Sequence, residues 1–172
     1  MTGRVEVRRV DEDSLEGLLA VAVEDAAPEE VMPPVAGPPG WTALRRDAFR
    51  DWHRSRFPGL AGPLGESTFT VVDDGVPVGS ARLALRGEGV LETGMWLGRS
   101  HRGRGIGTAA LRLLLDEAAR AGARVVVADT TADNSAALGV LRRSGAALTA
   151  GRESGDVLAE LTPVKVFPPR LR

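Results

Sequence analysis

The sequence predicts an α/β (α+β) fold, built on a mixed but mostly antiparallel central sheet of about six to seven strands. Two observations indicate this fold. Short apolar runs joined by tight turns fill residues 68–97, as in consecutive antiparallel strands. After residue 105 two helical patterns flank one apolar run, so at least one strand pair should be parallel. We expect helices on both faces of the sheet and a single domain over residues 1–172.

The first forty residues predict a strand, a helix and a long loop. Residues 4–10 alternate as a half-buried strand does, and Asp11 or Asp13 can then cap a helix. Five prolines and two glycines between residues 28 and 40 predict a loop, which is long enough to serve as a rim or lid. The apolar face of the predicted helix consists of Leu15, Leu18, Leu19 and Ala22.

Residues 41–57 return to helical spacing and carry many arginines. This helix could grip an anionic substrate or nucleic acid, or it could be a surface helix in which Asp47 and Asp51 neutralise arginines three residues on. We favour the surface helix. Its predicted apolar stripe consists of Trp41, Leu44, Ala48, Phe49 and Trp52.

The remaining elements follow in a regular order. Strands over residues 68–72 and 76–85 are joined by an Asp-Asp-Gly turn, and a third strand covers residues 90–97. A helix over residues 105–121 ends at Gly122, and residues 124–128 form a buried, parallel strand. A second helix opens at Asp133 or Asn134 and ends at Gly145. Residues 146–150 and 157–164 can close the sheet as a hairpin.

Composition excludes several classes of function. The chain has no cysteine, which removes disulfides, thiolate metal sites and a cysteine nucleophile. Its two histidines, His53 and His101, are far apart in sequence, which argues against a metal site. A net charge of −1 gives no electrostatic case for nucleic acid or an anionic membrane. No signal peptide or membrane span is recognisable, so we expect a cytoplasmic protein.

A glycine-rich turn between a strand and a helix is the most informative stretch. The first N–H groups of a helix lack intrahelical partners and carry a partial positive charge, so they bind anions. Glycines allow the main chain to approach a phosphate closely. The turn lacks the lysine of the NTPase phosphate loop. Residues 105–110 do fit the dinucleotide pattern G-x-G-x-x-A, with Asp129 downstream, but only about forty residues remain for the further βα units of that fold.

A second pattern explains more of the chain. Residues 102–107 read R-x-x-G-x-G, and about thirty residues later an asparagine opens a helix that ends at a glycine. Together they resemble the acetyl-coenzyme A site of the GNAT acetyltransferases over roughly residues 68–150. The resemblance implies a sheet splayed at the cofactor site and acetyl-CoA as co-substrate, without a metal. It assigns cofactor binding to Met95, Trp96, Leu97, Arg102, Gly103, Arg104, Gly105, Ile106, Gly107, Thr108 and Asn134.

The catalytic groups are harder to assign. Glu92 lies on the strand that leads into the turn, where many relatives carry a glutamate, and we expect apolar surroundings to raise its pKa so that it serves as the base. It could equally be a solvated strand carboxylate, or one that only orients the substrate ammonium. Asp129 is the second choice. Many relatives use a tyrosine as the acid, but the chain has none, and Leu141 stands at that position. Ser144, Ser135, Thr131 or water could protonate the thiolate, or no enzyme acid is needed.

The predicted function is transfer of an acetyl group from acetyl-CoA to a primary amine of a small molecule, peptide or protein. Without cysteine, the amine would attack directly. Two alternatives stay open: a GNAT-like module that binds acyl-CoA without turnover, and, less favoured, a dinucleotide-dependent oxidoreductase. Paired protomers are common in the family, which leaves a homodimer open.

Overall fold

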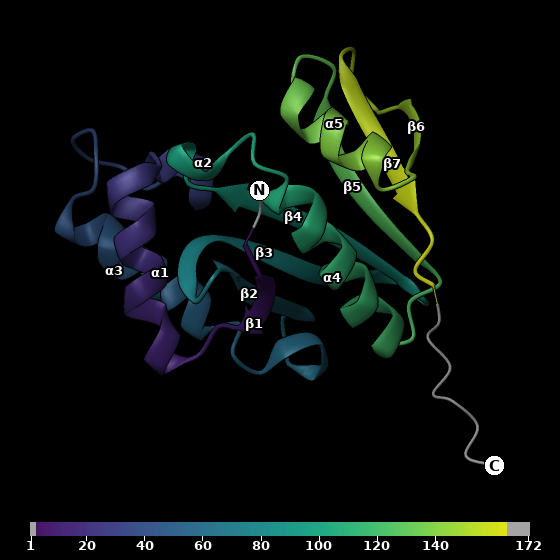
Figure 1. The fold of residues 1–172 in the computed structure, drawn as a ribbon. Coiled ribbons are helices and arrows are strands. Elements are labelled where there is room, and N and C mark those ends of the chain that lie inside the picture. The colour runs from purple at the N-terminus through teal and green to yellow at the C-terminus, as the bar shows by residue number, and fades with distance from the viewer. Residues whose placement is uncertain (1–2, 165–172) are drawn as a thin grey trace.

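The computed structural model describes residues 3–164, and over these residues the chain folds around one seven-stranded sheet (Figure 1). The strand order is β1-β2-β3-β4-β5-β7-β6. Only β4 and β5 are parallel; every other neighbouring pair is antiparallel, so the predicted fold class is confirmed. The ends of the predicted domain, residues 1–2 and 165–172, lie outside the described residues. The strands are β1 Val5–Arg9, β2 Glu66–Asp73, β3 Val76–Gly87, β4 Val90–Leu97, β5 Val125–Thr131, β6 Ala147–Ala150 and β7 Asp156–Leu161.

The predicted turn between β2 and β3 has the expected geometry. Asp74 and Gly75 both have positive φ angles, 47° and 81°, as a tight two-residue hairpin turn requires. This turn sets the register in which Thr68 faces Arg82 and Ser80 faces Thr70. The polar residues of β2 and β3 therefore gather on one face of the sheet.

Helices cover the two faces of the sheet differently (Figure 1). On one face α4 (Ile106–Arg120) buries Ile106, Ala110 and Leu114 against the main apolar cluster of the strands. On the other face α1 (Glu12–Asp25), α2 (Pro28–Val31) and α3 (Ala43–Arg54) enclose a second cluster around Leu18 and Phe49. Fully burying one such side chain contributes about 1.5–3 kcal/mol, so both clusters matter for stability. The last helix is α5 (Ser135–Arg143), and two 3-10 turns, η1 (Gly59–Ala61) and η2 (Arg99–His101), complete the elements.

The segment from residue 28 to 40 is only partly a loop, because α2 forms within it. Pro28 occupies the first helical turn, where its fixed φ favours a helix and its missing N–H is not needed. The Glu30 carboxylate accepts a hydrogen bond from the Ala27 N–H at 2.6 Å and closes the start of this short helix. The prediction that prolines exclude all regular structure here is wrong.

The buried face of α3 differs from the predicted apolar stripe. Arg45, Phe49 and His53 point inward, whereas Leu44 is 62% exposed. The buried Arg45 guanidinium donates hydrogen bonds to loop carbonyls, those of Val35, Gly37, Pro38 and Gly40. On α4 the buried residues include Leu111 but not Leu113.

The outer face of α3 confirms the surface-helix interpretation. Arg50 pairs with Asp47 at 2.8 Å, three residues earlier, and with Glu16 of α1 at 2.6 Å. Arg54 pairs with Asp51 at 4.0 Å and also with Glu12 of α1. These ion pairs tie α3 to α1 and neutralise Arg50 and Arg54, whereas Arg46 is exposed and has no acidic partner among residues 3–164.

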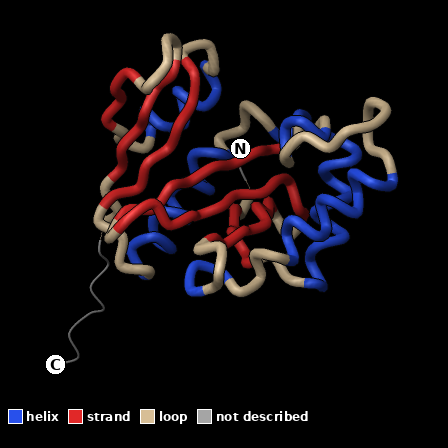
Figure 2. Tube along the Cα trace, turned by 180° about the vertical axis from the view of Figure 1, so that it is seen from behind, coloured by secondary structure: helices blue, strands red, loops and turns tan. Residues whose placement is uncertain are grey.

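The sheet opens between β4 and β5. Parallel pairing covers only the first residues of each strand and ends at Glu92 and Val127. Beyond this point β5 pairs with β7 as far as Thr131, and residues 93–97 of β4 have no neighbour on their β5 side. Figure 2 shows this divergence as two groups of strands that meet at one end. The splay lies directly before the glycine-rich turn.

None of the helices in residues 3–164 is long and apolar enough to cross a membrane.

Candidate active site

The glycine-rich turn presents a row of backbone N–H groups. Gly103 and Gly105 have φ angles of 73° and 81°, in the left-handed region that favours glycine, and Gly105 is the N-cap of α4. The N–H groups of residues 103–108 find no hydrogen-bond acceptor among residues 3–164. Six consecutive unpartnered N–H groups at the positive end of a fifteen-residue helix suit a diphosphate. The residues present therefore fit the predicted phosphate cradle.

The second helix of the motif packs against the cradle. A Cβ atom on Gly107 would lie 3.2 Å from Val140, so glycine lets α5 approach the first turn of α4. Arg143, also on α5, donates a hydrogen bond to the Thr108 hydroxyl at 3.3 Å. Arg143 was not predicted as a site residue, because only the packing of α5 on α4 brings it to the turn.

The two arginines of the turn have different surroundings. The Arg102 guanidinium donates to the Leu97 carbonyl at 3.0 Å and to the Glu30 carboxylate at 3.2 Å, so it is turned toward β4 and α2. Arg104 is exposed and has no acidic partner within the described residues. Arg104 is therefore the turn arginine that can reach an anion without giving up an existing ion pair.

The strand before the turn matches its expected role in shape. Met95 and Leu97 pack against the α4 side of the sheet, while Trp96 packs among the helices of the other side. Their backbone edge faces the splay, where a pantetheine arm would replace the missing strand. Asn134 caps α5, accepting a hydrogen bond from the Ala137 N–H at 3.1 Å. Contact of Asn134 with a coenzyme remains a prediction.

Glu92 does not have the apolar surroundings that we expected. It is 5% exposed and ion-paired with both Arg82 and Arg86. Burial alone would raise the pKa of this carboxyl, but the hydrogen bonds and charges of the two guanidinium groups together lower it below its usual value. The expected increase is wrong, and a carboxylate held in this way is a poor proton acceptor. The geometry favours a role for Glu92 in fixing Arg82.

The other two catalytic candidates lie apart from Glu92. Asp129 is exposed on the part of β5 that has left β4. Ser144 ends α5, and its hydroxyl donates to the Val140 carbonyl at 2.8 Å. Within residues 3–164, no hydrogen bond or ion pair joins the three candidates. Leu141, at the position of the relatives' tyrosine, is buried in the main core. Catalytic roles for Asp129 and Ser144 remain predictions.

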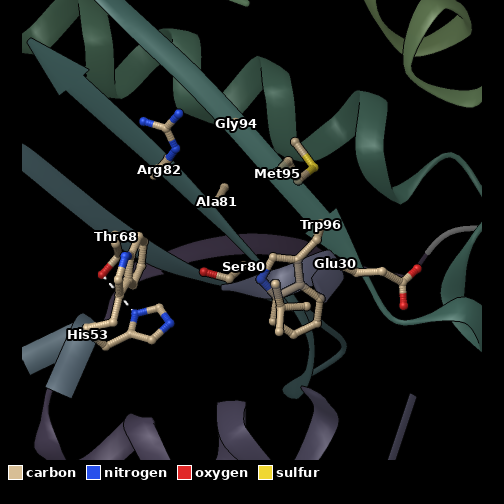
Figure 3. A pocket seen from close by; sticks show the side chains of 11 residues that line it. Glu30, His53, Thr68, Ser80, Ala81, Arg82, Gly94, Met95 and Trp96 are labelled. Carbon is tan, nitrogen blue, oxygen red and sulfur yellow. Dashed lines mark hydrogen bonds between the residues drawn. The ribbon is translucent and has the colours of Figure 1, made fainter. Parts of the chain in front are cut away.

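A cavity of about 180 Å³ lies beside the splayed part of β4, between the sheet and α2 and α3 (Figure 3). Its walls carry two hydroxyl groups, a buried imidazole and two indoles. His53 contributes the imidazole, and no sequence pattern had marked it as functional. Its polar and aromatic lining residues are Glu30, Trp52, His53, Thr68, Ser80, Arg82 and Trp96.

The described residues offer no metal site. Among residues 3–164 no group of three or more histidine, aspartate or glutamate side chains could hold a metal ion. His53 contacts Thr68, and His101 lies 3.9 Å from Asp25 at the far end of α1.

Comparison with known proteins gives one family match and several similar solved structures. The model of the acetyltransferase (GNAT) family matches residues 28–146. The structure of RimL, a ribosomal L7/L12 alpha-N-protein acetyltransferase in complex with coenzyme A, is similar at a TM-score of 0.73 and 20% identity, over 94% of this chain and 96% of that one. Mycobacterium smegmatis RimJ, in complex with a CoA-disulfide, is similar at a TM-score of 0.72 and 21% identity, over 93% and 82% of the two chains.

A third structure, yncA from Salmonella typhimurium with its cofactor acetyl-CoA, is similar at a TM-score of 0.65 and 22% identity, over 96% of this chain and 97% of that one. A search of curated protein sequences gave no match. At these identities the structural similarity concerns the fold, whereas the family match covers more than half of the chain.

Proposed function

Because the chain belongs to the GNAT acetyltransferase family, we propose that it transfers an acetyl group from acetyl-CoA to a primary amine of a small molecule, a peptide or a protein. The observation that carries this proposal is the row of unpartnered N–H groups over residues 103–108, next to a strand edge that has lost its neighbour. The coenzyme A and acetyl-CoA bound to RimL and yncA support it.

The donor side of the site acts mainly through the backbone. The N–H groups of residues 103–108 would hold the diphosphate, with Arg104 and Arg143 adding charge-assisted hydrogen bonds. The free edge of Met95, Trp96 and Leu97 would align the pantetheine arm as an added strand. Acetyl-CoA supplies a thioester carbonyl that an amine can attack.

The acceptor side must bind the amine in an uncharged state. A lysine-like amine with a pKa of about 10.4 is almost fully protonated near neutrality, and freeing it costs on the order of 4 kcal/mol. The chain has no cysteine, so the amine nitrogen would bond directly to the acetyl carbon as the carbon–sulfur bond breaks. The cavity beside residues 94–96 is the candidate space for such an amine.

The experiment has two parts. Calorimetry with acetyl-CoA tests the donor site, and Arg104→Ala should weaken binding about tenfold at low salt, because one charge-assisted hydrogen bond is lost. Release of free thiol with a broad panel of amines tests turnover. Binding without product would indicate an acyl-CoA-binding module, and stabilisation by NADH but not acetyl-CoA would indicate an oxidoreductase.

A further inference from the structure

His53 is placed in an unusual environment for a polar side chain. It is 1% exposed and lies on the inward face of α3, with its ring packed against Phe49 and Trp52. Its Nδ1 atom lies 3.3 Å from the Thr68 hydroxyl. Its other ring nitrogen, Nε2, is buried and finds no hydrogen-bond partner among residues 3–164. Buried polar atoms in proteins are normally satisfied, so this atom calls for an explanation.

His53 is one of the residues that line the cavity. Figure 3 shows Nδ1 bonded to Thr68, with the other nitrogen turned toward the side where Ser80 and Trp96 lie. The volume of about 180 Å³ holds roughly six water molecules or the amine end of a small side chain. A ligand that brings a hydrogen-bonding nitrogen into this space would satisfy Nε2.

The cavity is also close to the expected position of the thioester. Its floor includes the stretch of β4 that contains Gly94 and Trp96. One edge of this stretch pairs with β3, and the opposite edge faces the splay. Gly94 has no side chain, and a Cβ atom there would lie 3.2 Å from the Arg82 guanidinium. The Arg82 side chain therefore lies over Gly94, on the part of the cavity wall next to the splayed residues of β4.

On this basis, and given the proposed function, we propose that the cavity is the acceptor site and that His53 Nε2 is the catalytic base. It would accept a hydrogen bond from the acceptor amine and take its proton as the N–C bond forms. In that step the amine nitrogen bonds to the acetyl carbon, the C–S bond breaks and coenzyme A leaves as the thiolate. Thr68 is a positioning residue, because accepting Nδ1–H leaves the Nε2 lone pair directed into the cavity.

The protonation state of His53 agrees with this role. Burial, and to a lesser extent the charge of Arg56, lowers the pKa of His53 to about 4. The neighbouring charges are Glu66, which pairs with Arg56 at 3.1 Å, and Arg82 and Glu30 on the cavity wall. The imidazole therefore stays neutral near pH 7. A weak base is sufficient for this step, because an amine nitrogen becomes far more acidic as it is acylated.

Nuclear magnetic resonance of histidine-labelled protein reports the tautomer and the protonation state of His53 directly, without turnover. The chain contains only two histidines, so a His101→Gln variant assigns both ring signals. With and without coenzyme A, we expect His53 at pH 7 as the neutral tautomer with hydrogen on Nδ1, and we expect Thr68→Val to change the tautomer populations. A hydrogen on Nε2, or a doubly protonated ring, would overturn the proposal because no lone pair would face the cavity.

Kinetics supply the second readout, with the amine that reacts fastest in the panel. His53→Gln places an amide near Nε2 and His53→Asn keeps a group near Thr68, but neither can take a proton. Both should lower kcat about 100-fold or more, with the affinity for coenzyme A unchanged within about twofold. Leu44→Ala, an exposed change on the same helix, is the matched control. Unchanged kcat in folded His53 variants would overturn the assignment. Absence of coenzyme A binding in the unaltered protein would instead refute the proposed function.

Discussion

The Asp25 carboxylate, at the end of α1, accepts hydrogen bonds from both the backbone N–H and the hydroxyl of Ser100, which lies 75 residues later in η2. The oxygen–oxygen distance to the hydroxyl is 2.6 Å, and the N–H lies 3.1 Å from the nearer carboxylate oxygen. The Ser100 hydroxyl lowers the pKa of Asp25, so the contact is made by the charged form. This contact anchors the segment that leads into the phosphate cradle.

Replacing Asp25 should therefore affect binding of coenzyme A although the residue lies outside the cradle. We expect Asp25→Ala to weaken binding about tenfold in calorimetry, because it removes the carboxylate that accepts the two Ser100 hydrogen bonds and holds the turn. Glu24→Ala, an exposed change on the same helix, is the control. Equal affinities for the two variants would show that η2 holds its place without Asp25.

Glu92→Gln should reduce stability more than it reduces the catalytic rate. The change leaves Arg82 and Arg86 beside a neutral group, which we expect to lower the free energy of unfolding by about 1–3 kcal/mol. Chemical denaturation measures this loss, and the exposed Glu88→Gln is the control. Because Glu92 is held as an ion pair, kcat should fall less than about tenfold. A loss of 100-fold or more in folded protein would restore Glu92 as the base.

His53 should make stability depend on pH in a defined range. In the folded protein its pKa is lowered from 6.5 to about 4, so the unfolded chain binds the extra proton between these values. The free energy of unfolding keeps its full value with respect to His53 above about pH 6.5. It decreases as the pH falls toward 4, by up to about 1.4 kcal/mol per pH unit. Urea unfolding between pH 6 and 5 should show this slope in the unaltered chain and a smaller one in His53→Gln. Parallel slopes would mean that His53 titrates normally.

Arg45 should control the loop that follows α2. Its guanidinium holds four carbonyl oxygens of residues 35–40, with distances of 2.8 Å to Gly40 and Val35. Arg45→Ala should cost about 2 kcal/mol of stability and should speed proteolysis between residues 32 and 41. Leu44→Ala, at an exposed neighbouring position, should do neither. Faster cleavage in both variants would indicate that the loop opens independently of Arg45.

The sequence predicted the fold where its signals are local. The Asp74–Gly75 turn, the asparagine cap of α5 and the glycine after α4 all act through the conformation of one or two residues. The same holds for the cradle, since a strand, a glycine turn and an apolar helix in sequence are enough to align its N–H groups. Hydropathy patterns and turn residues record these features directly.

The sequence failed where burial depends on distant partners. Arg45 is buried because loop carbonyls accept hydrogen bonds from its guanidinium, and His53 is buried because the Thr68 hydroxyl faces its ring. Hydropathy had instead predicted Leu44 and Trp52 as the inward residues. Glu92 of β4 pairs with Ala84 of β3. This register places Arg82, which precedes Ala84 by two residues, on the same face of the sheet as Glu92. That register cannot be read from β4 alone. The acceptor side of the site is formed almost entirely by such contacts.

The proposed function depends above all on the backbone N–H groups of residues 103–108, which we expect to bind the diphosphate of acetyl-CoA. Amide resonances of nitrogen-labelled protein, followed during addition of acetyl-CoA, test it most directly. We expect the largest shifts at residues 103–108, with smaller ones along residues 93–97, and much weaker effects from pantetheine, which lacks the diphosphate. Saturable binding that leaves the amides of residues 103–108 unshifted would contradict the account.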